Sequence, residues 1–241
     1  MTVFTQIVKD YEICSEIPAV NLSFGGHSAA HKQVIFSIIK NYNDPVQVLD
    51  IGFGTGTLAR MVKSNPTTAH WHVDGVDGYH VNCSNKELFK EKLYRNIWHG
   101  LAQDLSPEQL GYYDVICLLD VIEHLTVDAA KSLVHSLLSC LRDDAYLFMS
   151  TPLWFYPQAT QQEGDMEEHL IGVPASSMLA LQPLMYTVGP YLVGNFVYSR
   201  ASLDFVDFFQ PSTDKNFTME KGIKIAKSVN MQLDVNTLYV V

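Results

Sequence analysis

The chain has 241 residues, of which 47% are apolar and 17% are charged, and its formal net charge is −10. This composition indicates a globular protein with one sizeable core and excludes an intrinsically disordered chain. The negative charge argues against a nucleic-acid partner, because a nucleic-acid surface requires a basic stripe.

Four cysteines are scattered along the chain without a C-x-x-C pair, which favours a reduced, cytoplasmic protein. The first residues carry neither the basic nor the apolar region of a signal peptide. Residues 169–199 contain no Asp, Glu, Lys or Arg, but Pro174, Pro183 and Pro190 interrupt them, so no membrane span is expected. We interpret this stretch as core, with an acceptor pocket or a homodimer face as the alternatives.

Three segments follow one another along the chain. Residues 1–45 are expected to form an N-terminal helical cover, in which Ser28 is a candidate N-cap. Apolar residues at helical spacing predict a helix over Val34 to Tyr42. Residues 46–200 form the predicted core, and residues 201–241 form a C-terminal appendage of the same domain.

Strands and helices alternate through the predicted core, which indicates a doubly wound α/β fold with a mainly parallel sheet. Strands are expected over residues 46–51, 71–76, 96–99, 113–119 and 146–149. Helices are expected directly after the first strand and over residues 85–94 and 133–141. The later elements are a helix through Leu181, an antiparallel pair within 185–200, a helix at 218–229 and a strand at 238–241.

A glycine-rich turn, Asp50-Ile51-Gly52-Phe53-Gly54-Thr55-Gly56, joins the first core strand to its helix. Its glycines permit positive φ angles and leave no side chain between the backbone and a ligand. The free N–H groups of the following helix favour a small, negatively charged group. Asp50, Asp77, Asp104 and Asp120 all fall at or just beyond strand ends, where α/β sheets bind their ligands.

The turn differs from the G-x-G-x-x-G pattern of nicotinamide-binding proteins. Together with three further motifs, it resembles the class I S-adenosylmethionine-dependent methyltransferases over about residues 46–200. Asp77 lies 21 residues beyond Gly56, where that family places a ribose-binding acid. Asp120-Val121-Ile122-Glu123-His124-Leu125 is similar to the D-x-x-E-H-[LV] sequence of the ubiquinone-biosynthesis-like subgroup, and Ser150-Thr151-Pro152 to the end of the fifth strand.

The resemblance implies a Rossmann-like sheet of seven strands with an antiparallel closing hairpin, and S-adenosylmethionine as cofactor. It also implies methyl transfer to an oxygen or nitrogen of a small-molecule acceptor. In this family the turn holds the methionine end of the cofactor, Asp77 the ribose hydroxyls and Asp104 the adenine amino group, with Leu105 beside the base. The implied cofactor-binding residues are Asp50, Gly52, Gly54, Gly56, Asp77, Gly78, Gln103, Asp104, Leu105, Leu119, Asp120 and His124.

A catalytic base is needed only if the acceptor loses its proton before or during methyl transfer. His169 is the favoured base, because related enzymes place a substrate-facing flap in its segment. His124 is the second imidazole candidate, with capping of a helix start and shielding of the cofactor as its alternative role. Glu168 is a carboxylate that can hold or replace an imidazole. His27 and His31 are interpreted as solvated loop histidines, with closure over the cofactor as the alternative.

A metal site is a further alternative. Asp120, Glu123, His124 and His169 resemble the E-x-x-E-H set plus distant His of the small-RNA 3′-terminal 2′-O-methyltransferases, which bind a divalent metal. The chain has Asp in place of the first Glu, and its acidity disfavours RNA, so we assign no metal ligand from the sequence. A nicotinamide-dependent oxidoreductase and a non-catalytic cofactor-binding adaptor are the remaining alternatives.

Overall fold

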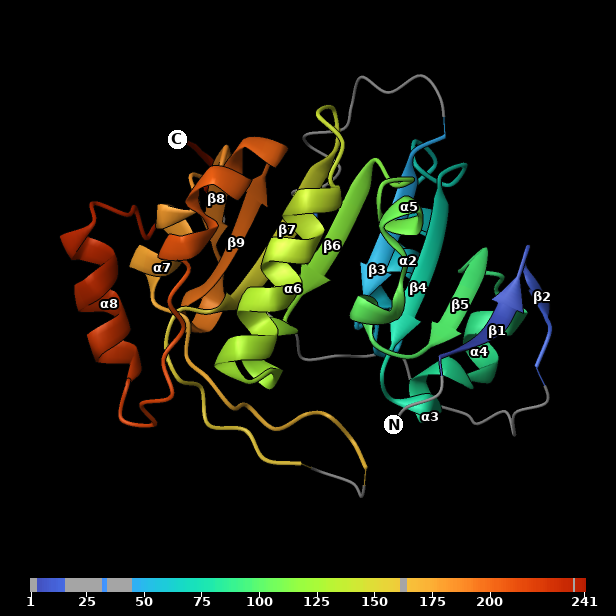
Figure 1. Ribbon diagram of the computed structural model, residues 1–241, viewed down its shortest axis with the longest axis horizontal. Helices are drawn as coiled ribbons and strands as arrows, with labels where there is room; N and C mark the ends of the chain where they lie inside the picture. Colours follow the sequence, from blue (N-terminus) through green and yellow to red (C-terminus); the bar gives the residue numbers. More distant parts are fainter. Residues whose placement is uncertain (1–3, 16–31, 34–44, 161–163, 236) are drawn as a thin grey trace. The chain divides into compact units, whose positions relative to one another are not determined.

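The computed structural model in Figure 1 describes residues 4–15, 32–33, 45–160, 164–235 and 237–241. The chain divides into two compact units. The first unit contains residues 1–27 and 35–117, and the second unit contains residues 28–34 and 118–241. The predicted helix over Val34 to Tyr42, its candidate N-cap Ser28, and His27 and His31 lie outside the described residues.

Three parallel strands form the centre of the first unit, namely β3 (Gln47–Ile51), β4 (His72–Asp77) and β5 (Asn96–His99). In the two registers, Ile51 lies opposite Val76 and Asp77 lies opposite His99. The chain passes from the first unit to the second within β6 (Val115–Leu119). The bounds of these four strands agree with the predicted bounds to within two residues. Their apolar side chains are buried, as the sequence pattern indicates.

The N-terminal segment departs from the predicted helical cover. Residues Thr5–Lys9 form β1 and Glu12–Ile13 form β2, which pair antiparallel with each other, while β1 also pairs antiparallel with β5 (Figure 1). The helical prediction is wrong for these residues, because Ile7 and Val8 bury themselves along a strand edge. Asp10 and Tyr11 both have positive φ, as a tight two-residue hairpin turn requires.

The first unit carries a long helix and several short ones. Helix α2 (Thr57–Ser64) begins directly after Gly56 and ends before Pro66, as predicted. The helix expected over 85–94 is shorter than predicted, because α4 (Lys86–Lys90) is followed by Lys92 in a left-handed conformation with φ of 48°. The short helices that were not predicted are α3 (His80–Cys83), η1 (Ala102–Asp104) and α5 (Pro107–Leu110).

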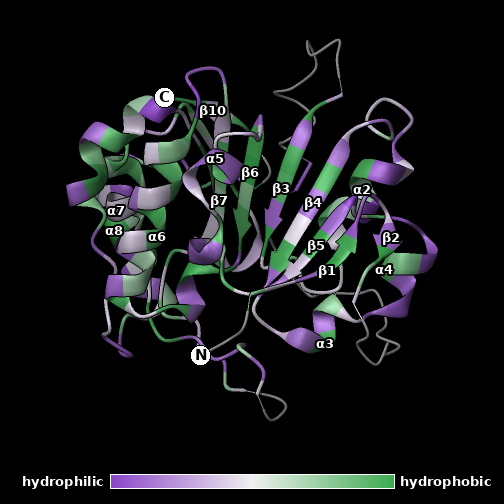
Figure 2. Cartoon of the chain, turned by 45° about the vertical axis from the view of Figure 1, so that its right-hand side comes forward, coloured by the Kyte–Doolittle hydropathy of each residue, from purple (hydrophilic) through white to green (hydrophobic). Residues whose placement is uncertain are grey.

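Four antiparallel strands form the sheet of the second unit in the order β10-β8-β9-β7. Their bounds are β7 (Tyr146–Pro152), β8 (Met185–Val188), β9 (Val193–Tyr198) and β10 (Tyr239–Val240). This confirms the predicted closing pair and the C-terminal strand. Strand β7 runs three residues beyond its predicted end, since Ser150 to Pro152 continue to pair with β9. In Figure 2, β6 and β7 are mostly hydrophobic, as expected of strands that contribute to a core.

The second unit contains both α-helices and short 3₁₀ helices. Helix α6 (Val127–Cys140) contains the predicted apolar stripe, and Thr126 caps its first turn. Met178 and Leu181 are completely buried, so the charge-free stretch serves as core at these positions. The other helices are η2 (Ile122–His124), α7 (Ala175–Ala180), η3 (Pro190–Leu192), η4 (Arg200–Phe208) and α8 (Met219–Ser228).

The α/β architecture is the predicted Rossmann-like fold, although the strand count differs. The described residues form ten strands instead of seven. Strands β3 to β9 account for the expected seven, and β1, β2 and β10 are additions near the two chain ends. Within the described ranges, no helix combines the length and apolarity needed to cross a membrane. The segment boundaries at residues 45/46 and 200/201 stay predictions.

Candidate active site

The glycine turn of the first unit follows the carboxyl end of β3. Gly52, Gly54 and Gly56 all adopt left-handed φ angles, of 65°, 55° and 84°. A Cβ atom added to Gly54 would meet no heavy atom within 4 Å, whereas one added to Gly56 would lie 2.5 Å from Leu88. The turn is therefore packed on one side at Gly56 and open at Gly54. This arrangement fits a cradle in which a ligand approaches the backbone closely.

Asp77, at the end of β4, is tied to this turn. Its Oδ2 accepts hydrogen bonds from the Gly54 N–H at 2.9 Å and from the Asn82 side chain at 3.1 Å. Its Oδ1 accepts one from the Tyr79 N–H at 2.8 Å. These bonds hold a buried carboxylate, 6% exposed, directly beside the open part of the turn. The predicted ribose-binding acid and the predicted methionine-binding turn are thus brought together.

Asp50 lies on β3 immediately before the turn and is 3% exposed. The Tyr94 hydroxyl donates a hydrogen bond of 2.8 Å to Asp50 Oδ2. Burial raises the pKa of Tyr94 well above its usual value, and the nearby charge of Asp50 raises it further, so the phenol keeps its proton. Sequence reasoning missed Tyr94, because no local motif marks a residue that reaches a strand 44 positions away.

The predicted adenine-binding residues lie in and after η1. Asp104 is exposed, and its Oδ2 accepts a hydrogen bond of 3.0 Å from the Leu101 N–H. This bond caps the start of η1, the short helix that contains Asp104. Gln103 is exposed and Leu105 is buried. The Gly78 carbonyl oxygen lies 3.2 Å from His99 Nε2. The structure thus gives Asp104 a local capping role, and its adenine-binding role stays a prediction.

In the second unit, Asp120 follows Leu119 at the end of β6 with a positive φ of 56°. Its N–H donates to the Ser150 carbonyl oxygen at 3.0 Å, and the Ser150 hydroxyl donates to Asp120 Oδ1 at 2.6 Å. A non-glycine residue in this conformation costs energy unless its surroundings hold it, and such residues cluster at functional sites. The two motifs that carry the resemblance here, around Asp120 and Ser150, therefore meet in space.

His124 and His169 form a pair, with ring centroids 4.6 Å apart. His169 Nδ1 lies 2.7 Å from the Tyr156 carbonyl oxygen, and His124 Nδ1 lies 3.2 Å from the Glu168 carbonyl oxygen. A carbonyl oxygen only accepts, so each ring carries its proton on Nδ1 and has its lone pair on Nε2. Burial lowers the pKa of His169 to about 4, with the His124 ring adding to the effect, and burial also lowers the pKa of His124.

Glu123 completes this cluster. One ligand atom from each of Glu123, His124 and His169 lies within 4.8 Å of the others. Glu123 is 2% exposed, and its Oε2 has no hydrogen-bond partner in the part of the chain that the structure describes. Burial raises the pKa of Glu123 well above its usual value, and the charge of Asp120 raises it further.

Two predicted residues take positions that differ from their expected roles. The Glu168 side chain is exposed, and it is the backbone carbonyl of Glu168 that contacts His124. Asp120 is outside the convergent group of three, which is Glu123, His124 and His169. Segment Leu170 to Ile171 is fixed to this group, because both N–H groups donate to the Glu123 carbonyl oxygen, at 2.8 and 3.3 Å.

The chain is similar to a known protein family and to two curated enzymes. A family model described as "Methyltransferase domain" matches residues 29–180, which is more than half of the chain. A ubiquinone biosynthesis O-methyltransferase of Aromatoleum aromaticum is 23% identical over 77% of this chain and 67% of its own length. An enzyme of the same name from Rickettsia prowazekii is 30% identical over 38% of this chain, and this chain spans only 36% of its length.

One solved structure shows a similar fold. The N-terminal domain of EvdMO1, crystallised in the presence of SAH and D-fucose, superposes with a TM-score of 0.50 at 13% identity. The match covers 76% of this chain and 90% of that domain. The ordered motifs, the glycine cradle joined to Asp77 and the family match all agree, and the chain belongs to the class I S-adenosylmethionine-dependent methyltransferases.

Proposed function

We propose that this chain transfers a methyl group from S-adenosylmethionine to an oxygen or nitrogen of a small-molecule acceptor. The observation that carries the proposal is the hydrogen bond from the Gly54 N–H to Asp77, which joins the open turn to a buried acid. O-methyl transfer is the activity named for both curated relatives, which favours oxygen over nitrogen.

The first unit supplies the proposed cofactor-binding groups. The glycine turn and the N-terminus of α2 offer N–H groups to the carboxylate of a methionine moiety. The two oxygens of Asp77 suit a pair of ribose hydroxyls. When bound, the cofactor supplies an electrophilic methyl group on a sulfonium. The other residues that the resemblance implies for cofactor binding stay part of the proposal, namely Gly78, Gln103, Asp104, Leu105, Leu119, Asp120 and His124.

The second unit supplies the proposed base. His169 Nε2 carries a lone pair at neutral pH, because Nδ1 is protonated and the pKa of the ring is lowered to about 4. This lone pair can accept a proton from an acceptor hydroxyl as its oxygen attacks, or from an acceptor ammonium group before its nitrogen attacks. The Tyr156 carbonyl oxygen then stabilises the imidazolium. His124 is the second candidate base, and Glu168 contributes the backbone carbonyl that orients the His124 ring.

The remaining expectations are part of the same proposal. We place the chain in the cytoplasm, because its four cysteines are scattered along the sequence without a C-x-x-C pair. We expect no nucleic-acid partner at a net charge of −10. A homodimer stays a prediction.

Calorimetry with unlabelled cofactors tests the donor. S-adenosylhomocysteine is expected to bind, and NADH is expected not to bind. The opposite result would contradict the proposal and favour the oxidoreductase alternative. Labelled S-adenosylmethionine with a panel of phenols, alcohols and amines then tests the reaction. Tight S-adenosylhomocysteine binding without turnover of any acceptor would favour the non-catalytic adaptor.

A second candidate role for the cluster is supported by a specific observation, namely the convergence of Glu123, His124 and His169 on one point. Two imidazole nitrogens and a carboxylate oxygen suit Zn²⁺, Mn²⁺ or Co²⁺. Backbone carbonyls hold both Nδ1–H groups, as outer-shell partners of metal-binding histidines commonly do. These residues fit a divalent ion, which would polarise an acceptor hydroxyl and take the place of the base.

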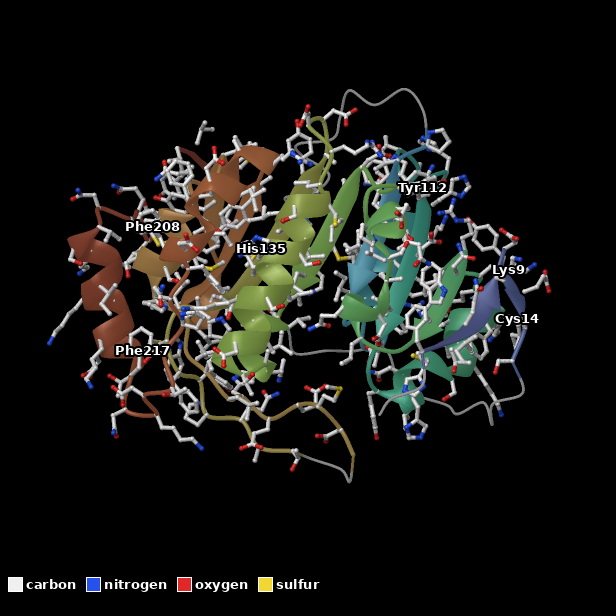
Figure 3. The ribbon with its side chains drawn as sticks, viewed as in Figure 1. Lys9, Cys14, Tyr112, His135, Phe208 and Phe217 are labelled. Carbon is white, nitrogen blue, oxygen red and sulfur yellow. The ribbon has the colours of Figure 1, made fainter. Side chains whose placement is uncertain are left out.

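Cobalt titration distinguishes the two roles. The metal role predicts a visible absorption band on adding Co²⁺ to the protein. The band should disappear in Glu123→Gln and persist in His135→Asn, which removes an exposed histidine of α6 (labelled in Figure 3). Methyl transfer that survives exhaustive chelation and is not raised by added Mn²⁺, Co²⁺ or Mg²⁺ would exclude the metal role and leave His169 as the base.

A further inference from the structure

The Tyr94 side chain is buried between the central strands and the glycine turn of the first unit. It lies in the segment between α4 and β5, and its residue is 2% exposed. Its ring contacts Phe53 of the turn, with the centroids 4.9 Å apart. Its hydroxyl reaches Asp50 Oδ2 at 2.8 Å, and the charges of both Asp50 and Asp77 act on it. One phenol thus links three parts of the proposed cofactor site.

Two glycines make room for this ring. A Cβ atom on Gly75 of β4 would lie 3.0 Å from a Tyr94 ring atom and 2.7 Å from Phe53. A Cβ atom on Gly56 would lie 3.4 Å from the Tyr94 ring. The backbone therefore approaches the ring closely from β4 and from the start of α2. The ring fills a space bounded by the turn on one side and the neighbouring strand on the other.

The hydroxyl has a specific task at this position. Asp50 and Asp77 are both buried acids at the ends of adjacent strands, so both side chains need donors if they are to stay charged. Asp77 receives donors from Gly54, Tyr79 and Asn82. Tyr94 gives Asp50 a donor whose ring is buried and packs against Phe53.

We propose that Tyr94 is a positioning residue that holds Asp50 and the glycine turn in the geometry that binds S-adenosylmethionine. This inference rests on the proposed function. Tyr94 does not contact the cofactor in this scheme. It acts through the Asp50 carboxylate and through its packing against Phe53.

Tyr94→Phe removes the hydroxyl and leaves the ring. The affinity for S-adenosylhomocysteine, measured by calorimetry, is expected to fall about tenfold or more, since hydrogen bonds to charged groups are the strong ones. In turnover assays the loss should appear in the KM for the methyl donor and leave the KM for the acceptor unchanged. Circular dichroism and the Tm establish that the variant is folded.

The first unit offers a matched control. Tyr113 is also buried, at 3% exposure, and its hydroxyl donates to Asp74 Oδ2 at 3.0 Å. This second tyrosine–aspartate pair lies toward the amino ends of β3 and β4, where Tyr112 is labelled in Figure 3 and donates to Gln47. Tyr113→Phe should lower the Tm to a similar degree and leave the affinity for S-adenosylhomocysteine within twofold of wild type.

A double-mutant cycle shows whether Tyr94 acts through Asp50. Asp50→Asn weakens the hydrogen-bond acceptor of the Tyr94 hydroxyl. The affinity of the double variant for S-adenosylhomocysteine should therefore equal that of Asp50→Asn alone. Additive losses, or wild-type affinity in Tyr94→Phe, would overturn the proposal while the proposed function stands. If Tyr94→Phe does not fold, Asp50→Asn tests the same bond, and wild-type affinity there overturns it. A wild-type protein that binds no S-adenosylhomocysteine would overturn the proposed function together with this inference.

Discussion

His169 Nδ1 lies 2.7 Å from the backbone carbonyl oxygen of Tyr156, and this contact determines which ring nitrogen is available for chemistry. The proton sits on Nδ1, so the lone pair is on Nε2. The neighbouring His124 is oriented in the same way by the Glu168 carbonyl. Both rings are neutral at pH 7, because burial lowers the pKa of each. The Nε2 lone pairs of His124 and His169 can therefore accept a proton or bind a cation.

Replacement of His169 tests the proposed base. In His169→Asn the amide can still donate to the Tyr156 carbonyl, but the Nε2 lone pair is lost. We expect kcat to fall by about 10²- to 10⁴-fold, while calorimetric affinity for S-adenosylhomocysteine stays unchanged. His135→Asn, at an exposed position of α6, is the control and should retain wild-type kcat. A kcat within threefold of wild type in His169→Asn would remove this residue from the mechanism.

The stability of the protein should depend on pH through the same ring. The pKa of His169 is about 4 in the folded protein and about 6.5 when unfolded. The unfolded chain therefore binds more protons as the pH falls from 6.5 to 4. Chemical denaturation in EDTA should show about 1–2 kcal/mol of stability lost over this range, allowing for solvent screening. His169→Asn should lose less, and an equal loss in both proteins would contradict the prediction.

Gly54→Ala tests whether the open side of the turn is a ligand cradle. The left-handed φ of 55° predicts a destabilisation of about 1 kcal/mol, since no atom lies within 4 Å of the added methyl. The methyl should nevertheless weaken S-adenosylhomocysteine binding strongly, because it occupies the open side. Gly164→Ala, at φ of 80° and equally unobstructed, provides the same backbone strain in the second unit. Equal calorimetric affinities in the two variants would contradict the cradle.

Substitutions of Asp77 and Asp104 distinguish a cofactor-binding acid from one that caps a helix. Asp77→Asn loses a carboxylate that accepts three hydrogen bonds beside the turn, and its Kd for S-adenosylhomocysteine should rise about 100-fold. Asp104→Asn changes an exposed acid that caps η1, and its Kd should rise less than tenfold. Calorimetry on both variants checks the order. A larger effect at Asp104 would make the adenine contact the dominant one.

The sequence was sufficient for the parts of the fold that local patterns control. Strand β6 reads as a continuous apolar run, and the glycine turn marks its own position. Strand β1 was missed because its burial comes from an antiparallel partner, β5, about 90 residues later. The helix at 85–94 was predicted too long because nothing local shows that Lys92 takes a left-handed conformation.

In the candidate site, too, the sequence predicted local features and missed those that depend on long-range contacts. Asp77 was placed correctly beside the turn, since its spacing and strand end are local properties. The sequence did not indicate Tyr94, because its proposed role depends on a hydroxyl that contacts Asp50 on β3. Glu123 was considered only as part of a motif, whereas its buried oxygen without a partner among the described residues is a three-dimensional property.

The chain passes from the first compact unit to the second within β6, between Cys117 and Leu118. The turn, Asp77 and Tyr94 all belong to the first unit, and Glu123, His124 and His169 all belong to the second. Under the proposed function, the glycine turn that binds the methyl donor and the base that serves the acceptor therefore belong to different compact units. A chimaera in which the corresponding segment of a relative replaces residues 118–241 would test whether the acceptor can be exchanged while the methyl donor stays the same.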